Sequence, residues 1–524
     1  MQDVTRRDVL KGVGAAMGVA ASAGLLTSLA QAEDAKAAGA FVPSFFEKPE
    51  AIADVAEELD YEIVVVGAGS AGVVCAAVAA EMGAKVALLQ KEAWACSQGG
   101  SSAGVDLENS DPEAVAAMVS MLMEENAFRS RRECLQAWAD NSGEAMQWVI
   151  DRAQEHLSFC KPSSATMEFN GKTVTFVKNT FTNKPYANNE AMGELCEYGV
   201  SVGVEAYFST PACQLVQDVS GAVTGVIAQR EDGTYAQFNA SKGVVICTGD
   251  YQNDEEMCSY YLPELVNMER KQFNKTGDGH KMIVWAGGKM EEPCHTKMLH
   301  DYDGGPGNMA DMPYLAVKDD GTRFVDESVE MSLLNNFLRG PQDAGWYSQV
   351  FDSDYVSVGD AWGMHASSPE DMENYMSELD NEKKGVYPGL VNTFRADTLE
   401  ELAEKVGITD VEQFLSTVAR YNEICETGSD VDFGKDSKFL APVVNPPFYA
   451  IHRHVRISAI CAGCDVNAEQ QCLTPEGEVI EGLYACGNAS RFYGGVDYPL
   501  DITGLSIGRS YTQGYMVGKA LAAK

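Results

Sequence analysis

A glycine-rich segment between two expected β-strands constrains the fold of this chain more than any other feature. Residues 61–66 read YEIVVV, an apolar and β-branched run that predicts a buried strand. The segment Gly67-Ala68-Gly69-Ser70-Ala71-Gly72 follows directly, before an alanine-rich stretch to Met82 that predicts a helix and a second strand from Lys85 to Leu89. This strand–turn–helix–strand order predicts a dinucleotide-binding fold, because a glycine-rich turn that opens a helix can hold a diphosphate.

The three glycines of this turn have separate tasks. Gly67 makes the tight turn, Gly69 lets the backbone approach the diphosphate, and Gly72 lets the helix pack closely on the strand. The amides at the N-terminus of the helix face the phosphate charge. An acid usually follows the second strand and accepts hydrogen bonds from the ribose, but here the position is Gln90, with Lys91 after it; Gln90 can still accept such a bond.

A second loop rich in glycine and serine, Ser97–Gly104, reads SQGGSSAG. Its backbone amides can lie against a diphosphate and an isoalloxazine ring, and enzymes that bind NAD do not need such a loop. The loop therefore favours FAD as the cofactor. The residues expected to contact FAD here are Gly99, Gly100, Ser101, Ser102, Ala103 and Gly104.

The N-terminal segment resembles a twin-arginine signal peptide. Arg6 and Arg7 precede an apolar run of small residues, and Ala30-Gln31-Ala32 is a plausible cleavage site. The run is too short and too rich in Gly and Ala for a transmembrane anchor, and no later stretch is apolar enough to span a bilayer. We expect a signal peptide at 1–32, a linker at 33–58, no membrane span in the mature chain, and export of the folded protein to the periplasm or another extracytoplasmic location.

The charge balance excludes some partners. The chain has 77 acidic and 39 basic side chains, a formal net charge of -38. Such a charge repels phosphate backbones and anionic lipids, so nucleic acid is not expected as a partner. Two interpretations remain open: a solvated surface that keeps the protein soluble, or a docking face for a basic electron-donor protein.

The 14 cysteines are scattered without the spacing of a disulfide framework. Cys461 and Cys464, with Cys472 and Cys486 further on, could in principle hold an iron-sulfur cluster, but the spacing matches no standard pattern. We therefore predict no metal site. No Cys-x-x-Cys-His segment occurs, which excludes covalently attached haem.

Four later segments resemble the flavoprotein family of fumarate reductase and succinate dehydrogenase, whose relatives include urocanate reductase and 3-ketosteroid dehydrogenase. They read GVVICTGDYQN at 243–253, TGDG at 276–279, GLYACGN at 482–488 and GLSIGRSYTQGYMVG at 504–518. Two positions depart from the family pattern, Asp250 in place of a glycine and Asn488 in place of an acid. The resemblance covers residues 60–524 and implies further FAD contacts from Val216, Thr248, Gly249, Asp278, Gly487, Asn488, Leu505 and Ser506.

The same resemblance implies the domain organisation. The fold class is α/β, a Rossmann-like FAD-binding domain with an inserted α+β capping domain. The FAD-binding domain would comprise residues 59–290 and 440–524, and the cap residues 291–439, where substrate is enclosed at a domain interface. Helical patterns at 397–406 and 410–421 suit such a cap.

The resemblance also implies a proton donor. Residues 321–327 read GTRFVDE and match the family's Gly-x-Arg-Phe-x-x-Glu segment, so Arg323 is the expected donor. An arginine can act in this way only when neighbouring carboxylates hold it and restore its proton, and Asp326 or Glu327 could do so.

The family's clamp for a dicarboxylate substrate is missing. No arginine lies between Arg270 and Arg323, Ser458 and Ala459 stand at the positions of the family's histidines, and Asp501 stands where a substrate-binding arginine is usual. Because arginine and histidine bind carboxylates and Asp501 would repel them, fumarate is a poor expected substrate.

Other candidate site residues carry two interpretations each. His295, with His300 nearby, could polarise a carbonyl group or be a structural histidine, and Tyr498 could bind a ketone oxygen or only pack among aromatic residues. The function expected is an extracytoplasmic FAD-dependent reductase of an enone, lactone or aryl-acrylate in anaerobic respiration, which receives electrons from a separate cytochrome or quinol-linked donor. The alternatives are a dehydrogenase that desaturates a ketosteroid-like substrate with a tyrosinate base, and a flavin electron-transfer protein.

Overall fold

The computed structural model describes residues 25–182, 187–300, 305–342, 344–381, 383, 386 and 388–524, so the motif at Arg6 and Arg7 lies outside the described residues. The chain divides into two compact units. Unit 1 comprises Met1–Pro263, Asn274–Thr296 and Ile460–Lys524, and unit 2 comprises Glu264–Phe273 and Lys297–Ala459. The domain boundaries expected from the sequence stay a prediction. Over the described residues, no helix is both long and apolar enough to cross a bilayer.

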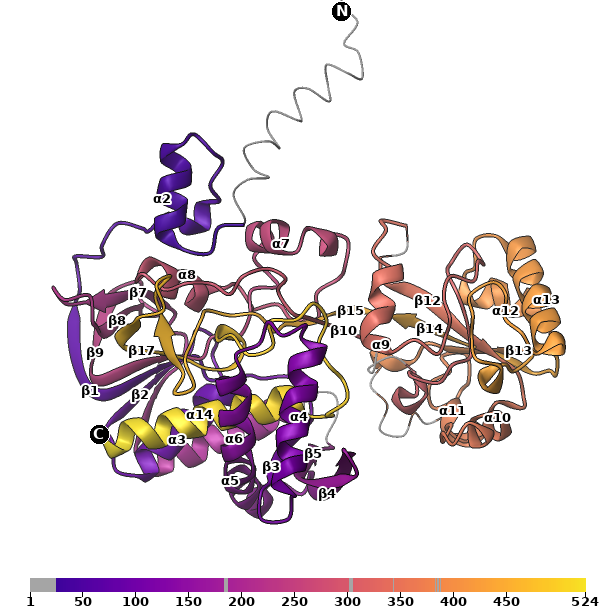
Figure 1. Cartoon of the computed structure of the whole chain (residues 1–524), viewed down its shortest axis with the longest axis horizontal. Helices are drawn as coiled ribbons and strands as arrows, with labels where there is room; N and C mark the ends of the chain where they lie inside the picture. Colours follow the sequence, from indigo (N-terminus) through magenta and orange to yellow (C-terminus); the bar gives the residue numbers. More distant parts are fainter. Residues whose placement is uncertain are drawn as a thin grey trace, which may run out of the picture. The chain divides into compact units, whose positions relative to one another are not determined.

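A parallel sheet forms the centre of unit 1 (Figure 1). Its strand order is β16-β17-β9-β1-β2-β6, in which β16 is antiparallel to β17 and the other neighbours are parallel. The expected strands are present as β1 and β2, which pair from Ile63 with Val86 to Val66 with Leu89. This arrangement confirms the predicted α/β fold. The bounds are β1 Glu57–Val66, β2 Val86–Leu89, β6 Val204–Tyr207, β9 Tyr235–Ile246, β16 Gln471–Leu473 and β17 Val479–Ala485.

The other strands of unit 1 extend or accompany this sheet. β8 (Val223–Gln229) pairs antiparallel with β9 and with β7 (Ala212–Gln217). A separate antiparallel sheet has the order β3-β5-β4, with β3 Ser101–Asp106, β4 Cys160–Phe169 and β5 Lys172–Phe181. The helices are α2 Leu29–Ala37, α3 Ser70–Glu81, α4 Pro112–Glu125, α5 Arg132–His156, α6 Ala187–Ser201, α7 Glu255–Tyr261, α8 Asp278–Trp285 and α14 Leu505–Ala523, with short 3-10 turns at Ser44–Phe46, Pro263–Leu265 and Gly487–Ala489.

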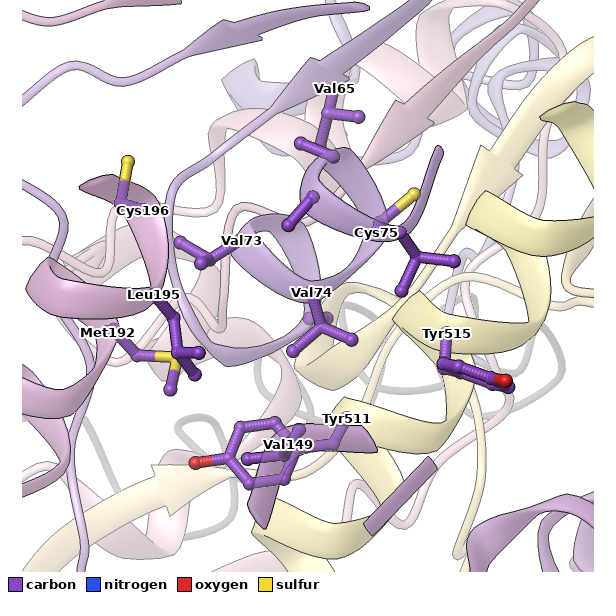
Figure 2. Close-up of a cluster of buried hydrophobic side chains, with 14 of the residues drawn as sticks. Val65, Val73, Val74, Cys75, Val149, Met192, Leu195, Cys196, Tyr511 and Tyr515 are labelled. Carbon is purple, nitrogen blue, oxygen red and sulfur yellow. The ribbon is translucent and has the colours of Figure 1, made fainter. Parts of the chain in front are cut away.

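Helix α3 is deeply buried in unit 1, and every residue from Ala71 to Ala80 is buried. Figure 2 shows the surrounding apolar cluster, with Val65 from β1, Val149 from α5, Leu195 from α6 and Tyr511 from α14 gathered around Val73 and Val74. Burial of a valine or leucine side chain contributes roughly 1.5–3 kcal/mol, so this cluster supplies much of the stability of unit 1. It also fixes the N-terminus of α3 at the end of β1.

Helix α14 packs against α3 with almost no space between the backbones (Figure 1). A Cβ atom added to Gly514 would lie 2.1 Å from the carbonyl oxygen of Ala71, and one added to Gly518 would lie 2.5 Å from that of Cys75. Glycine at these two positions therefore permits the contact between the helices.

Unit 2 is built on a four-stranded antiparallel sheet of order β11-β12-β14-β13. Helices α12 and α13 pack on it through a cluster that includes Leu402, Phe414 and Val418, as the expected α+β cap requires. Thr398 and Asp410 cap the two helices by accepting hydrogen bonds from backbone amides of their first turns. The bounds are β11 Leu315–Val317, β12 Trp346–Phe351, β13 Thr393–Ala396, β14 Phe448–His454, α12 Leu399–Val406 and α13 Val411–Thr427.

The remaining elements of unit 2 are short. β10 (Lys297–His300) pairs with β15 (Arg456–Ile460), whose last residue belongs to unit 1. A second apolar cluster includes Met309, Tyr314, Phe351 and Met372 and involves the short helices α10 (Tyr355–Ala361) and α11 (Pro369–Glu373). The other short elements are α9 Met331–Leu334 and the 3-10 turns at Gly307–Met309, Asn335–Phe337, Pro388–Leu390 and Ser437–Phe439.

The contact between α3 and α14 predicts opposite effects for two glycine-to-alanine changes inside helices. Gly514→Ala places a methyl group against backbone and should lower the free energy of unfolding by about 1–3 kcal/mol. Gly193→Ala in α6, where a Cβ atom has no neighbour within 4 Å, should raise it by about 1 kcal/mol. Urea denaturation followed by circular dichroism measures both changes, and equal stability of the two variants would contradict the close contact.

Candidate active site

A cleft opens where the parallel strands β1, β2, β9 and β17 of unit 1 end. It encloses about 1020 Å³ of empty space, part of which is open to solvent. Ligands of open α/β folds bind at this edge of the sheet. The lining residues that the sequence predicted for FAD are Gly67, Ala68, Gly69, Ser70, Ala71, Gln90, Lys91, Thr248, Gly249, Asp278, Gly487, Asn488 and Ser506.

The glycine turn forms one wall of the cleft. Gly67 has a φ of +104°, and a Cβ atom there would lie 2.5 Å from the carbonyl oxygen of Cys247. Gly72 does not line the cleft. A Cβ atom there would lie 1.8 Å from the carbonyl oxygen of Gly67, so glycine at this position permits the turn. Gly69 differs from both, because a Cβ atom there meets only the carbonyl oxygen of Cys96, at 3.4 Å.

Helix α3 begins at this turn without a side-chain cap. The first amides of an α-helix have no partner inside the helix, and they carry the positive end of its dipole. Ser70 and Ala71, in this first turn, line the cleft together with the backbone of Gly69. The turn thus offers unpaired amides and free space together, which fits a diphosphate.

Lys91 and Asp278 form an ion pair at the cleft. The Nζ atom of Lys91 lies 2.9 Å from Oδ2 of Asp278 and 2.6 Å from Oγ1 of Thr276. Burial alone would raise the pKa of Asp278, but Lys91 holds that pKa below its ordinary value. The side chain of Gln90 donates a hydrogen bond to the carbonyl oxygen of Trp94 and accepts one from the Lys91 amide. These bonds stabilise the loop of residues 90–94 that follows β2.

The second loop contributes to the cleft at its beginning, through Ser97 and Gln98, whereas residues 99–104 do not line it. Gly99 and Gly100 give their carbonyl oxygens to the amides of Asn188 and Phe181, and residues 101–104 belong to β3. The amide of Ala103 donates to the carbonyl oxygen of Gly504 directly before α14. These residues support the wall of the cleft, and their predicted contact with FAD stays a prediction, as does that of Val216 in β7 and of Leu505 at the start of α14.

Asn188 in α6 links three walls of the cleft and was missed by the sequence analysis. Its Nδ2 atom donates to Oγ of Ser70, Oγ of Ser97 and the carbonyl oxygen of Gln98, while its Oδ1 accepts from the hydroxyl of Tyr511. A single asparagine has no motif around it, so only the tertiary structure identifies this role.

Asp250 brings a buried carboxylate to the cleft at a position where the related family has glycine. Burial raises the pKa of Asp250, whereas the amide of Gln252 and the charge of Lys275 oppose that rise. Its carboxylate accepts hydrogen bonds from the amides of Gln252 and Ile460. Lys275, which sequence reasoning also missed, lines the same part of the cleft.

The N-terminus of α14 forms a further wall. The amide of Ser506 donates to the hydroxyl oxygen of Tyr498 over 3.0 Å, and burial raises the pKa of Tyr498. Fully buried Arg509 donates to the carbonyl oxygen of Gly487 and to Oδ1 of Asn488. Asn488, which replaces an acid of the family, is therefore held by an arginine that sequence reasoning did not single out.

His295 is enclosed in unit 1 and does not line the cleft. Its Nδ1 lies 2.5 Å from the hydroxyl of Tyr251, its Nε2 lies 3.1 Å from the carbonyl oxygen of Glu291, and its ring stacks on Tyr261 at 4.4 Å. Burial lowers the pKa of His295 to about 3. Loss of solvent contact also holds the pKa of His300, a half-buried residue of unit 2, well below its ordinary value.

Arg323 lies in unit 2 and is held by two carboxylates. Its Nε and Nη2 atoms donate to the two oxygens of Glu327 over 2.8 Å each, and Nη2 also lies 2.8 Å from Oδ2 of Asp430. Burial alone would lower the pKa of Arg323, but Glu327 and Asp430 raise it above its ordinary value. The buried Nη1 atom has no hydrogen-bond partner among the described residues. Asp326 instead accepts bonds from Ser328.

The fourteen cysteines all lie in the described parts of the chain, and the structure joins none of them in a disulfide bond. Cys461, Cys464, Cys472 and Cys486 are buried, and burial raises the pKa of the Cys464 and Cys472 thiols. In the described parts of the chain, no group of three or more His, Cys, Asp or Glu side chains is placed to hold a metal ion.

Comparison with known proteins gives the family of this chain. The sequence model of the FAD binding domain family matches residues 62–498. Vinyl phenol reductase of Lactiplantibacillus plantarum is 27% identical over 517 residues, which cover 89% of this chain and 97% of that protein. Digoxin reductase of Eggerthella lenta is 25% identical over 541 residues, which cover 92% and 90% of the two chains.

A solved structure supports the fold independently. The open conformation of a flavocytochrome c3 fumarate reductase aligns with a TM-score of 0.69 at 21% identity, over 94% of this chain and 80% of that one. At this identity the likeness concerns the fold alone.

The free space beside Gly69 gives a test of FAD binding that does not depend on turnover. Gly69→Val should fold normally, because its φ of -99° suits any residue, but its side chain would occupy the place of the diphosphate. We expect purified Gly69→Val to lack the visible absorbance of bound flavin. Its circular dichroism spectrum should match that of the wild type. Gly193→Ala is the matched control and should stay yellow. Full flavin content in Gly69→Val would contradict the placement of the diphosphate.

The amides of the Gly67–Gly72 turn, the cleft behind them and the ion pair of Lys91 and Asp278 fit a bound dinucleotide. The family match extends over most of the chain, and the two relatives described above are named as reductases. The chain therefore belongs to the FAD binding domain family and is an FAD-dependent oxidoreductase of the fumarate reductase-like type.

Proposed function

We propose that this flavoprotein reduces an activated C=C bond of an enone, a lactone or an aryl-acrylate rather than of fumarate. Two relatives support this substrate class by their names, since vinyl phenol carries a C=C bond on an aromatic ring and digoxin carries one in a lactone ring. FAD held in the cleft beside Gly67 and Gly69 would, once reduced, supply the hydride that one carbon of the double bond needs. The protein must then protonate the other carbon.

The geometry of Arg323 carries this proposal. Three of its five N–H groups are bound by Glu327 and Asp430, and Nη1 is left with two donors that no described residue accepts. A guanidinium held in this way presents a fixed N–H bond to a substrate and stays protonated between turnovers. Arg323 is thus our candidate for the proton donor, and Glu327 is the carboxylate that holds it.

The side chains that would hold a dicarboxylate are absent from the matching positions. Ser458 and Ala459 stand where related proteins have histidines, and Asp501 stands where they have an arginine. A carboxylate repels a dianion, so the proposal favours a neutral or singly charged substrate.

Two alternatives make different demands on the chain. A dehydrogenase that desaturates a ketosteroid would need a tyrosinate, and burial raises the pKa of Tyr498, which disfavours that form, although the amide of Ser506 that donates to the same oxygen opposes the rise. A flavin electron carrier would need no proton donor, so the bound geometry of Arg323 counts against it. Both remain outcomes of the experiment below.

Reoxidation of the reduced protein tests the proposal. The FAD-loaded protein is reduced with dithionite without oxygen and mixed with 4-vinylphenol, digoxin, cinnamate, cyclohexenone, androstenedione or fumarate, and flavin absorbance gives the rate. We expect at least one activated alkene to react rapidly and fumarate to be among the slowest. Rapid reaction with fumarate would refute the argument that the chain lacks a clamp for dicarboxylates. Failure to react with any alkene would refute the proposed reductase function. Reduction of the oxidised protein by a saturated ketosteroid would favour the dehydrogenase.

The same experiment on Arg323→Ala separates an enzyme from a carrier. Loss of a general acid should slow the reaction with the alkene by about 100-fold to 10,000-fold. The reaction with ferricyanide needs no proton at carbon and should keep its rate. Arg395→Ala, at a partly exposed arginine of the same unit, is the control and should behave as the wild type. Equal alkene rates in all three proteins would exclude Arg323 as the proton donor, whereas a wild type that reacts with ferricyanide but with no alkene would favour a carrier.

We propose in addition that the protein is exported by the twin-arginine pathway and receives electrons from a separate cytochrome or quinol-linked donor in anaerobic respiration. Arg6 and Arg7 support export, and the absence of a Cys-x-x-Cys-His segment from the sequence supports a separate donor. Replacement of both arginines by lysine should keep the protein in the cytoplasmic fraction, whereas Lys11→Arg should not. Unchanged distribution of the double variant would contradict this route.

A further inference from the structure

Arg323 belongs to a cluster of four buried charges that no motif of the sequence indicated. Arg323, Glu327, Asp430 and Lys435 have side chains that are 6%, 2%, 0% and 0% exposed. We propose that Asp430 and Lys435 are positioning residues, which fix the Arg323 guanidinium so that its Nη1 atom alone stays available to protonate the substrate. This inference rests on the proposed reductase function and extends it to the loop of residues 429–435.

Asp430 holds Arg323 from a rigid loop. Helix α13 ends at Gly428, whose φ of +67° turns the chain, and the loop then wraps around the Asp430 carboxylate. One carboxylate oxygen accepts the amides of Asp432 and Phe433, and the other accepts the amide of Lys435 and Nη2 of Arg323. Burial alone would raise the pKa of Asp430, but the bond from Arg323 holds it well below its ordinary value. Asp430 is therefore a fixed anion.

Lys435 holds the second carboxylate of the cluster. Its Nζ atom lies 3.1 Å from Oε2 of Glu327 and donates to the hydroxyl of Tyr421 and the carbonyl oxygen of Pro313. These three partners occupy the three N–H bonds of the ammonium group. Glu327 thus lies between two cations, and the cluster as a whole carries no net charge. A buried carboxylate with a cation on each side has little freedom to turn.

Aromatic rings complete the enclosure. The guanidinium carbon of Arg323 lies 5.0 Å from the centre of the Tyr421 ring and 4.9 Å from that of Phe433. Cation–π contacts of this kind restrict the plane of the guanidinium. Since Tyr421 also accepts from Lys435, one side chain orients both cations. These contacts fix the plane of the Arg323 guanidinium and the positions of its Nε and Nη2 atoms. Its Nη1 atom has no hydrogen bond to a described residue.

The charges of the cluster bear directly on the proposed protonation step. In the proposed step an N–H bond at Nη1 of Arg323 breaks and a C–H bond forms at the substrate carbon that does not receive the hydride. The neutral guanidine then takes a proton from water, which restores the original charges. Glu327 and Asp430 favour that return because both are anions in contact with the guanidine.

The environment of Lys435 predicts a pH dependence. Burial lowers the pKa of Lys435 below 10.5, while Glu327 opposes the change. The other titratable groups that face it are Arg323, Cys425 and Tyr421. As the pH rises through this lowered pKa, the ammonium loses its charge and Glu327 loses one of its two cations. The rate of alkene reduction should therefore fall at alkaline pH in the wild type.

Three variants test the inference by reoxidation of the dithionite-reduced, FAD-loaded protein. The probe is the compound among 4-vinylphenol, digoxin, cinnamate and cyclohexenone that oxidises the wild type fastest. We expect Asp430→Asn and Lys435→Met to lower the rate by about tenfold or more, since small misplacement of a catalytic group costs up to about 100-fold. Both variants should keep the flavin content and the ferricyanide rate of the wild type. Lys438→Met, at an exposed lysine of the same segment, should change none of these quantities.

The pH profile and a conservative variant distinguish positioning from general destabilisation. Lys435→Met should lose the alkaline decrease in rate that the wild type shows, and Lys435→Arg should recover much of the activity with that decrease moved to higher pH. If Asp430→Asn or Lys435→Met keeps the alkene rate and the pH profile of the wild type, the positioning role is wrong while the proposed reductase function stands. Parallel loss of the alkene rate, the ferricyanide rate and flavin would also overturn it, as a sign of unfolding. A wild type that reduces none of the four compounds would instead overturn the proposed function on which the inference rests.

Discussion

The close contact of backbone with backbone at the Gly67–Gly72 turn is the constraint on which unit 1 depends. A side chain at Gly67 would collide with the carbonyl oxygen of Cys247, and one at Gly72 with that of Gly67 itself. The turn therefore brings the end of β1, the end of β9 and the start of α3 within contact distance. Because α3 is buried from Ala71 to Ala80, its N-terminal amides cannot move away from the cleft. Stability and cofactor binding thus share one structural cause.

Each unit places its charges differently. In unit 1 the cleft combines unpaired helix amides with the ion pair of Lys91 and Asp278, an arrangement that suits a phosphorylated cofactor. In unit 2 four buried charges neutralise one another around Arg323. Burial of unpaired charges is costly, so such a cluster is stable only when every member keeps a partner. Within this cluster of described residues, Nη1 of Arg323 is the donor atom without a hydrogen-bond partner, and it is for this reason the chemically informative atom of the four side chains.

Local sequence patterns predicted the elements around the cofactor well. The run YEIVVV became β1, the helix ended at Glu81 beside the expected Met82, and the cap helices were found at Leu399–Val406 and Val411–Thr427. Other predictions needed long-range contacts. Residues 99–104 support β3 and α14 and do not line the cleft, while Asn188, Asp250 and Arg509 bring polar groups to it or hold its walls. A hydrogen bond between residues that lie 22 positions apart, as Arg509 and Gly487 do, or 118 apart, as Asn188 and Ser70 do, leaves no periodic trace in the sequence.

The sequence by itself determined the α/β class, the glycine turn, the cofactor and the segment that contains Arg323, because each depends on residues close together along the chain. Only the tertiary structure decided which atoms surround these groups. It enclosed His295 between Tyr251 and Glu291, placed the Tyr498 hydroxyl on the Ser506 amide, and brought Asp430 and Lys435 to Arg323 and Glu327. The physical reason is that burial and pairing of charges depend on neighbours from distant segments, which pack together only in the folded chain.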